Sequence, residues 1–148
     1  MAIHPTAIID PTAEIAGDAE VGPYTVIGPN VKIGPGTEIG PHVFIYKNTT
    51  VGRDCRIWNG AALGADSQDL KYNGQPTFLE IADRTTIREF ATMNRATTEG
   101  CATHVGSDCL IMAYSHVAHD CTVGDNVILS NSVNMAGHVT IGDYAIIS

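Results

Sequence analysis

The chain has 148 residues, of which 44% are hydrophobic, and its formal net charge is −8 with only eight lysines and arginines. This length favours a single domain, and the hydrophobic content excludes a disordered chain. The small number of cations excludes a general nucleic-acid-binding surface and a polybasic membrane surface.

A six-residue repeat starts near the N-terminus with IHPTAI and IDPTAE and runs to the end of the sequence. Every sixth residue from Ile3 to Ile147 is Ile, Val, Leu or Met, except Asp69, Gln75 and Glu99. This period fits neither a helix face nor an alternating strand and is typical of a hexapeptide β-helix. We expect each of these aliphatic side chains to point inward, with neighbouring coils about 4.8 Å apart.

Glycine follows the aliphatic residue in many hexads, as at Gly22 and Gly34, and a proline often comes next. These positions predict turns. Glycine there supplies either permissive dihedral angles or room for a neighbouring backbone. Proline suits a turn position that needs no N–H donor.

Two segments interrupt the repeat, and after each the aliphatic residues resume in the same phase. Residues 66–80, DSQDLKYNGQPTFLE, are polar and contain the turn signals Asn73-Gly74 and Gln75-Pro76, which predict a loop that projects from the coils. Residues 97–104, TTEGCATH, predict a second, shorter excursion. Loops on a rigid scaffold often carry binding residues, although a solvated insertion without a function fits the same pattern.

The stretch SHVAHDCTVGDN places His116 and His119 three residues apart, with Asp120 directly after the second histidine. The residue types alone leave three interpretations open. The histidines could be metal ligands, one could be a general base oriented by the carboxylate, or both could be polar surface residues of the repeat.

Longer segments carry a more specific resemblance. QDLKYNGQPTFLEIADRTTIREFATMNRAT, VGSDCLIMAYSHVAHDCTVGDN and NMAGHVTIGDYAIIS together resemble the acyl-[acyl-carrier-protein]–UDP-N-acetylglucosamine O-acyltransferases, from the opening IHPTAIIDPTAEI to the last residue. The resemblance implies an all-β fold, a left-handed parallel β-helix shaped as a triangular prism of about eight coils. The period itself does not fix the hand, and general crossover rules favour a right-handed one.

The resemblance also implies an activity. The family transfers a 3-hydroxyacyl chain, or a plain fatty acyl chain in some members, from acyl carrier protein to the 3-hydroxyl of UDP-N-acetylglucosamine, the first step of lipid A biosynthesis. It acts as a homotrimer with active sites between neighbouring prisms, and the enzyme needs no metal or cofactor. By this match His119 is the general base, Asp120 orients it, and the backbone N–H of Gly137 lies where the oxyanion forms.

The same match assigns substrate contacts. His116 would line the cleft and His138 would contact the substrate, while the projecting loop would contact the sugar nucleotide across the trimer interface. The loop residues concerned are Gln68, Asp69 and Lys71. The lysine offers a point charge for a ligand phosphate.

Two departures from the family pattern stand out. Asn94 replaces a histidine of many members, and Ala96 replaces a usual glycine; an amide can still serve a neutral hydrogen-bonding role in substrate binding. The family also continues past Ser148 with further coils and a C-terminal helical domain. We therefore expect residues 1–148 to form the β-helix domain alone, without the helical domain and without the residues that measure acyl-chain length, and activity to be impaired.

Other functions stay open at this stage. A zinc carbonic anhydrase of the same prism class would use three histidines, for which His116, His119 and His138 are candidates. An acetyl-CoA-dependent transferase and a non-catalytic trimeric scaffold are further alternatives. The QDLKY segment favours the acyltransferase.

The four cysteines form no C-x-x-C pair, which excludes a zinc ribbon and a thioredoxin-like motif. They are typical of small buried residues in a reducing compartment. With no signal-peptide pattern and no long apolar run, the sequence predicts a cytoplasmic protein that does not insert into a membrane.

Overall fold

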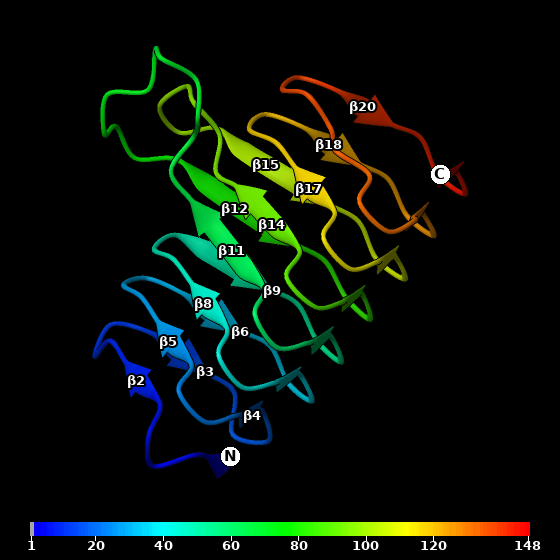
Figure 1. The fold of residues 1–148 in the computed structure, drawn as a ribbon. Coiled ribbons are helices and arrows are strands. Elements are labelled where there is room, and N and C mark those ends of the chain that lie inside the picture. Colours follow the sequence, from blue (N-terminus) through cyan, green and yellow to red (C-terminus); the bar gives the residue numbers. More distant parts are fainter. Residues whose placement is uncertain (1) are drawn as a thin grey trace.

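The computed structural model describes residues 2–148, which form a left-handed parallel β-helix of three sheets (Figure 1). Sheet A has eight strands, β1 (Ala2–Ile3), β4 (Glu20–Val21), β7 (Glu38–Ile39), β10 (Arg56–Ile57), β13 (Thr86–Ile87), β16 (Leu110–Ile111), β19 (Ile128–Leu129) and β21 (Ile146–Ile147). Sheet B has six, β2 (Ile8–Ile9), β5 (Val26–Ile27), β8 (Phe44–Ile45), β11 (Ala62–Ala65), β14 (Thr92–Asn94) and β17 (His116–Val117). Sheet C has seven, β3 (Glu14–Ile15), β6 (Lys32–Ile33), β9 (Thr49–Val51), β12 (Phe78–Ile81), β15 (Ala102–Val105), β18 (Thr122–Val123) and β20 (Thr140–Ile141).

The hydrophobic core is a stack of the aliphatic residues that recur every six positions. Successive coils add strands to the three sheets in turn, and the eight strands of sheet A confirm the expected number of coils. Side chains such as Ile45, Leu63 and Ile111 are fully buried. Burying one such side chain contributes about 1.5–3 kcal/mol to stability, so the repeat both defines and holds the prism.

Two residues of the hexad meet different backbone requirements at the turns: one adopts a positive φ, and the other allows a neighbouring coil to approach closely. The residue three positions after the aliphatic one adopts a positive φ, as at Asn48 (φ 58°) and Asp120 (φ 61°). The glycine directly after the aliphatic residue instead makes a close approach. A Cβ on Gly34 would lie 2.5 Å from the carbonyl carbon of Gly52 in the next coil. Room for the neighbouring backbone, rather than left-handed φ, therefore explains the glycine at Gly34.

The two interruptions both leave the prism where the chain passes from sheet B to sheet C, and we call this edge the B–C corner. The first occupies residues 66–77, so the expected loop ends three residues early, because 78–80 already belong to β12. The second occupies residues 95–101, because β15 begins at Ala102. Residues 69, 75 and 99, the three exceptions to the repeat, lie in these segments. Figure 1 shows the first insertion projecting well beyond the coils.

The insertions preserve strand register. Consecutive strands of sheet A usually pair at an interval of three hexads, as Glu20 does with Glu38. Across the first insertion Arg56 pairs with Thr86, an interval of five hexads. Across the second, Thr86 pairs with Leu110, an interval of four hexads. Both intervals are whole numbers of hexads, which explains why the aliphatic phase survives.

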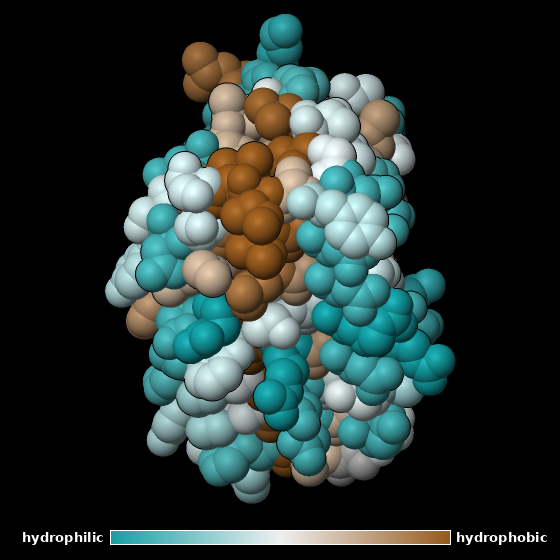
Figure 2. Space-filling model, turned by 90° about the vertical axis from the view of Figure 1, so that its right-hand side faces the viewer, coloured by the Kyte–Doolittle hydropathy of each residue, from teal (hydrophilic) through white to brown (hydrophobic). Residues whose placement is uncertain are grey.

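The outer face of sheet A is charged toward the N-terminus and apolar toward the C-terminus. Toward the N-terminus its outward residues include Glu20, Glu38 and Arg56, and toward the C-terminus they are Leu110, Ile128 and Ile146, paired in register. Figure 2 shows an apolar band on this side of the molecule, above a more polar surface. Within residues 2–148, the structure has no helix with the length and hydrophobicity that a membrane span requires.

Candidate active site

The site lies at the B–C corner of four successive coils. The first insertion leaves from β11, the second from β14, and the pair His119 and Asp120 follows β17 at the same corner. Gly137 and His138 follow one coil later, between the bridge at Asn134 and β20. Residues distant in sequence converge because parallel coils repeat the same corner about every 4.8 Å.

His119 and Asp120 form a tightly held pair. The Nδ1 atom of His119 lies 2.8 Å from Oδ2 of Asp120 and 3.2 Å from the hydroxyl oxygen of Thr97. The backbone N–H of Thr97 donates to both carboxylate oxygens, at 3.1 and 3.2 Å. The backbone N–H of Asp120 donates to the Thr103 hydroxyl at 2.9 Å. These contacts leave the carboxylate little freedom to rotate.

The carboxylate of Asp120 stays ionised at neutral pH. Burial raises the pKa of Asp120. The hydrogen bonds from His119 and Thr97 and the nearby charge of His138 together lower it by more, so its pKa lies below the usual value. An ionised carboxylate accepts a hydrogen bond from the Nδ1–H of His119, which leaves Nε2 with a free lone pair. The pair therefore has the arrangement of a general base with an orienting acid.

Gly137 packs directly against the ring of His119. A Cβ at residue 137 would lie 2.3 Å from Cε1 and 2.5 Å from Nε2 of that histidine. The neighbouring His138 lies edge-on to the same ring, with centroids 5.3 Å apart, and its Nε2 is 3.6 Å from the Asp120 carboxylate. The side chain of His138 is mostly exposed, so it can meet a ligand from solvent.

His116 lies beside the pair but on sheet B. Its Nδ1 is 2.7 Å from the hydroxyl of Thr92 on the neighbouring strand. Burial lowers the pKa of His116, and the neighbouring His119 lowers it further, so a neutral imidazole is favoured at this position.

The first insertion is joined to the histidine pair through hydroxyl groups. The Ser67 hydroxyl lies 2.7 Å from that of Thr97, and Ser67 also accepts the backbone N–H of Asp69 at 3.2 Å. Asp69 in turn accepts the backbone N–H of Lys71 at 2.8 Å. Gln68 and Lys71 are exposed, and Asp69 is half-buried. The structure thus brings Asp69 to the histidine pair and leaves Gln68 and Lys71 open to solvent.

Asn94 differs from the other candidates because its side chain is buried at 3% exposure. It ends β14, next to Ala65 in the register of sheet B. Within residues 2–148 its Oδ1 atom has no hydrogen-bond partner. A substrate contact by Asn94 stays a prediction.

One group of side chains could hold a metal ion. Single ligand atoms of Asp69, His119 and His138 lie within 4.8 Å of one another. This group contains Asp69 in place of His116, which the sequence had offered as a third ligand. Nitrogen and carboxylate oxygen ligands of this kind suit zinc.

Sequence reasoning missed three residues that shape the site: Ser67, Arg95 and Thr97. Arg95 and Thr97 belong to the second interruption, where the period no longer predicts which way a side chain points. A basic residue two positions after Met93, the last aliphatic repeat residue before the interruption, is the one signal that the sequence offers.

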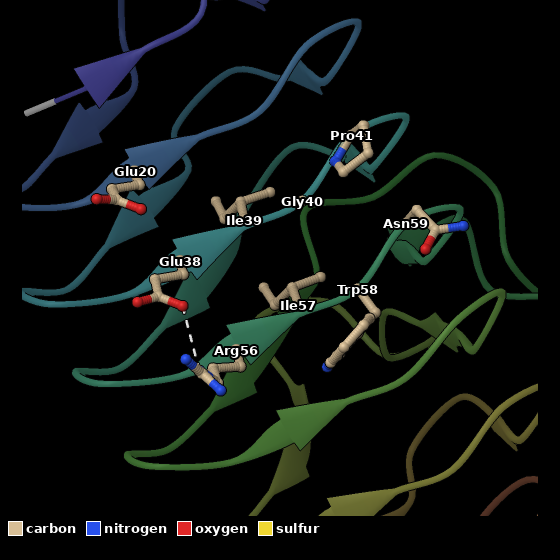
Figure 3. A pocket seen from close by; sticks show the side chains of 9 residues that line it. All are labelled: Glu20, Glu38, Ile39, Gly40, Pro41, Arg56, Ile57, Trp58 and Asn59. Carbon is tan, nitrogen blue, oxygen red and sulfur yellow. Dashed lines mark ion pairs between the residues drawn. The ribbon is translucent and has the colours of Figure 1, made fainter.

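A hollow lies on sheet A, away from the B–C corner. It encloses about 430 Å³ between Glu20, Glu38, Arg56 and Trp58 (Figure 3). The Arg56 guanidinium is paired with Glu38 at 3.1 Å, and Figure 3 shows no histidine or cysteine among the side chains that line it. It lacks the base that the B–C corner provides.

Comparison with known proteins agrees with this architecture. Residues 2–35, 30–65 and 102–136 match the family described as bacterial transferase hexapeptide (six repeats). The chain is 47% identical to LpxA from Acinetobacter baumannii over 99% of its own length and 57% of that chain, with a TM-score of 0.95.

Two further solved structures give the same result. The chain is 46% identical to the UDP-N-acetylglucosamine O-acyltransferase of Moraxella catarrhalis, over 99% of its own length and 57% of that chain, with a TM-score of 0.96. It is 34% identical to the UDP-N-acetylglucosamine acyltransferase of Arabidopsis, over 97% of its own length and 58% of that chain, with a TM-score of 0.81. The chain therefore spans little more than half the length of the enzymes that it matches.

Proposed function

Because the chain belongs to the bacterial transferase hexapeptide family, we propose that it transfers an acyl chain from acyl carrier protein to the 3-hydroxyl of UDP-N-acetylglucosamine. This would be the first step of lipid A biosynthesis. Solved structures named UDP-N-acetylglucosamine acyltransferases support the proposal. The observation that carries it is the His119–Asp120 pair, which holds a basic nitrogen at the corner walled by the two insertions.

The chemistry needs one base and one oxyanion site. Nε2 of His119 takes the proton of the sugar hydroxyl while that oxygen attacks the thioester carbonyl. The ionised Asp120 stabilises the imidazolium that forms. The backbone N–H of Gly137 is proposed to stabilise the oxyanion, a type of contact worth about 3 kcal/mol in other enzymes. The intermediate then expels the carrier-protein thiolate, which receives the proton from His119.

The acceptor would bind at the first insertion. Lys71 offers its ammonium group to a phosphate, and Gln68 and Asp69 offer hydrogen bonds to the sugar nucleotide. His138 is proposed to contact the substrate and His116 to line the cleft as a neutral imidazole. No cofactor is required of the protein, since the activated acyl group arrives on the carrier protein.

A homotrimer is proposed because sheet B presents an unpartnered apolar column. Its outward residues Ile8, Val26 and Phe44 pair in register, and the column continues through Ala62 toward the histidine pair. Ile8 and Phe44 are 66% and 39% exposed. Apolar area of this kind favours contact with a neighbouring prism. A cytoplasmic location stays a prediction.

The test is an acyl-transfer assay with UDP-N-acetylglucosamine and a panel of acyl-carrier-protein thioesters. His119→Ala should lower kcat by at least about 100-fold, because it removes the base, and should leave the fold intact. His104→Ala is the matched control, since His104 lies on sheet C and pairs with Glu80. A folded His119→Ala variant with parental activity would refute the assignment of the base.

A zinc enzyme is the second candidate, favoured by the grouping of Asp69, His119 and His138. Elemental analysis separates the two candidates. Stoichiometric zinc that disappears in His138→Ala would favour this alternative, and metal-free active protein would eliminate it. A protein that neither transfers acyl groups nor binds the sugar nucleotide would instead be a scaffold.

A further inference from the structure

Arg95 is a fully buried arginine whose side-chain hydrogen bonds reach the end of β11 and two residues of the first insertion. Its Nη2 donates to Oδ1 of Asp66 at 2.5 Å and to the hydroxyl of Tyr72 at 2.9 Å. Its Nη1 donates to the carbonyl of Gly64, where β11 leads into the insertion. The guanidinium therefore holds both the start and the middle of the segment 66–77.

This burial is poorly explained by stability alone. Removing a charge from water is costly, and an apolar side chain at a core position often serves stability equally well. Nε of Arg95 has no partner, and neither do Oδ1 of Asn94 and Oγ1 of Thr77. These are the three buried side-chain atoms without a partner in the described part of the chain, and all lie where the insertions leave the prism.

Surface arginines elsewhere behave differently. Arg84 pairs with Asp108 through two hydrogen bonds of 2.9 and 3.1 Å, but both side chains are substantially exposed. Such a pair is screened by water and contributes little to stability. Arg95 is instead removed from water and donates to three protein acceptors in a fixed geometry. This arrangement is suited to holding the first insertion against the prism.

The same short segment links the insertion to the base. Two residues after Arg95, the Thr97 hydroxyl contacts both Ser67 and Nδ1 of His119. The side-chain amide of Gln75, near the other end of the insertion, donates to the Thr97 carbonyl at 2.5 Å. Any movement of the insertion is thus transmitted to the residue that holds the catalytic pair.

We propose that Arg95 is a positioning residue that clamps the first insertion through Gly64, Asp66 and Tyr72, and so sets the distance between its acceptor-binding residues and His119. The inference rests on the proposed function, because it assigns the sugar nucleotide to this insertion. Arg95 touches no reacting atom. It acts through the backbone that carries Gln68, Asp69 and Lys71.

The test compares Arg95→Lys with Arg84→Lys as the matched control. A lysine keeps the charge but cannot reach three acceptors with one ammonium group. In Arg95→Lys, amide hydrogen exchange should become at least about fivefold faster in residues 66–77 and stay unchanged in the core strands. The dissociation constant for UDP-N-acetylglucosamine should rise about tenfold, with kcat within about threefold of the parent. Arg84→Lys should change none of these.

Two milder variants guard against misfolding of the lysine variant. Asp66→Ala and Tyr72→Phe each remove one acceptor of Arg95, and the Asp66 side chain is 68% exposed, so the prism should fold normally. Both should shift loop exchange and nucleotide affinity in the same direction as Arg95→Lys, by smaller factors.

Each outcome decides a different point. Parental exchange rates in residues 66–77 of Arg95→Lys would overturn the clamp. Faster exchange with unchanged nucleotide affinity would overturn the positioning role. A parent that neither binds the nucleotide nor transfers acyl groups would sink the proposed function and, with it, the positioning role, while the exchange comparison would still decide the clamp.

Discussion

The B–C corner carries two different pairs of residues at different heights of the same prism. In the uninterrupted N-terminal coils it holds Lys47 and Asn48, and in the C-terminal coils it holds His119 and Asp120. Asn48 and Asp120 share nearly the same backbone conformation, with φ of 58° and 61°. The two turns therefore share this backbone conformation. They differ in their side chains and in the insertions, which surround only the second.

The comparison teaches that the scaffold and the site have separable requirements. The N-terminal coils need inward aliphatic residues and tight turns. The coils that follow keep the same inward stack and add buried polar groups such as Arg95, Asn94 and Thr97. A change in the first region should lower stability without changing the chemistry, and a change in the second should act mainly on the chemistry.

The largest expected effect is on the scaffold. Ile45→Ala leaves a cavity in a fully buried stack and should lower the free energy of unfolding by about 4 kcal/mol, measured by urea denaturation. The folded fraction should keep the kcat of the parent. Thr50→Ala, at an exposed position, is the control. A large fall in the kcat of fully folded Ile45→Ala protein would contradict the separation of the two regions.

The next effect concerns the site. Gly137→Ala would place a methyl group 2.3 Å from Cε1 of His119, so the ring must move. We expect kcat to fall by about 100-fold, because a displacement of about 1 Å at a base costs this much. Gly17→Ala is the control, because nothing lies within 4 Å of a Cβ there. Equal activity of the two variants would show that the ring tolerates displacement.

The smallest effect is on stability at acid pH. Asp120→Asn gives this corner the amide that Asn48 has in the regular coils. The pKa of Asp120 is lowered in the folded state, so its contribution to stability is present above the usual carboxyl pKa near 4 and is lost as pH falls through the lowered value. Below about pH 4 the parent should therefore lose stability more steeply than the variant, as urea titrations at several pH values would record. Parallel curves would contradict this.

The sequence predicted the fold and part of the site, for a clear physical reason. A period of six fixes which residues face inward, so the core follows from it, whereas the coil count came from the family resemblance. Spacing also relates Asp120 to His138, since positions three hexads apart stack in consecutive coils, as Thr122 and Thr140 do. Inside the insertions the period sets no direction. The burial of Arg95 and Asn94 and the contacts of Thr97 depend on how two irregular segments pack, and required the structure.

The lengths of the two insertions have a consequence of their own. The first insertion lengthens its coil by two hexads and the second by one. Deleting twelve residues from the first or six from the second would therefore leave a sequence that still reads as an unbroken repeat. The prism can therefore gain or lose such loops at this corner without resetting the phase of anything downstream. Insertions of whole hexads thus allow one β-helix to acquire different loops at this corner while its core stays unchanged.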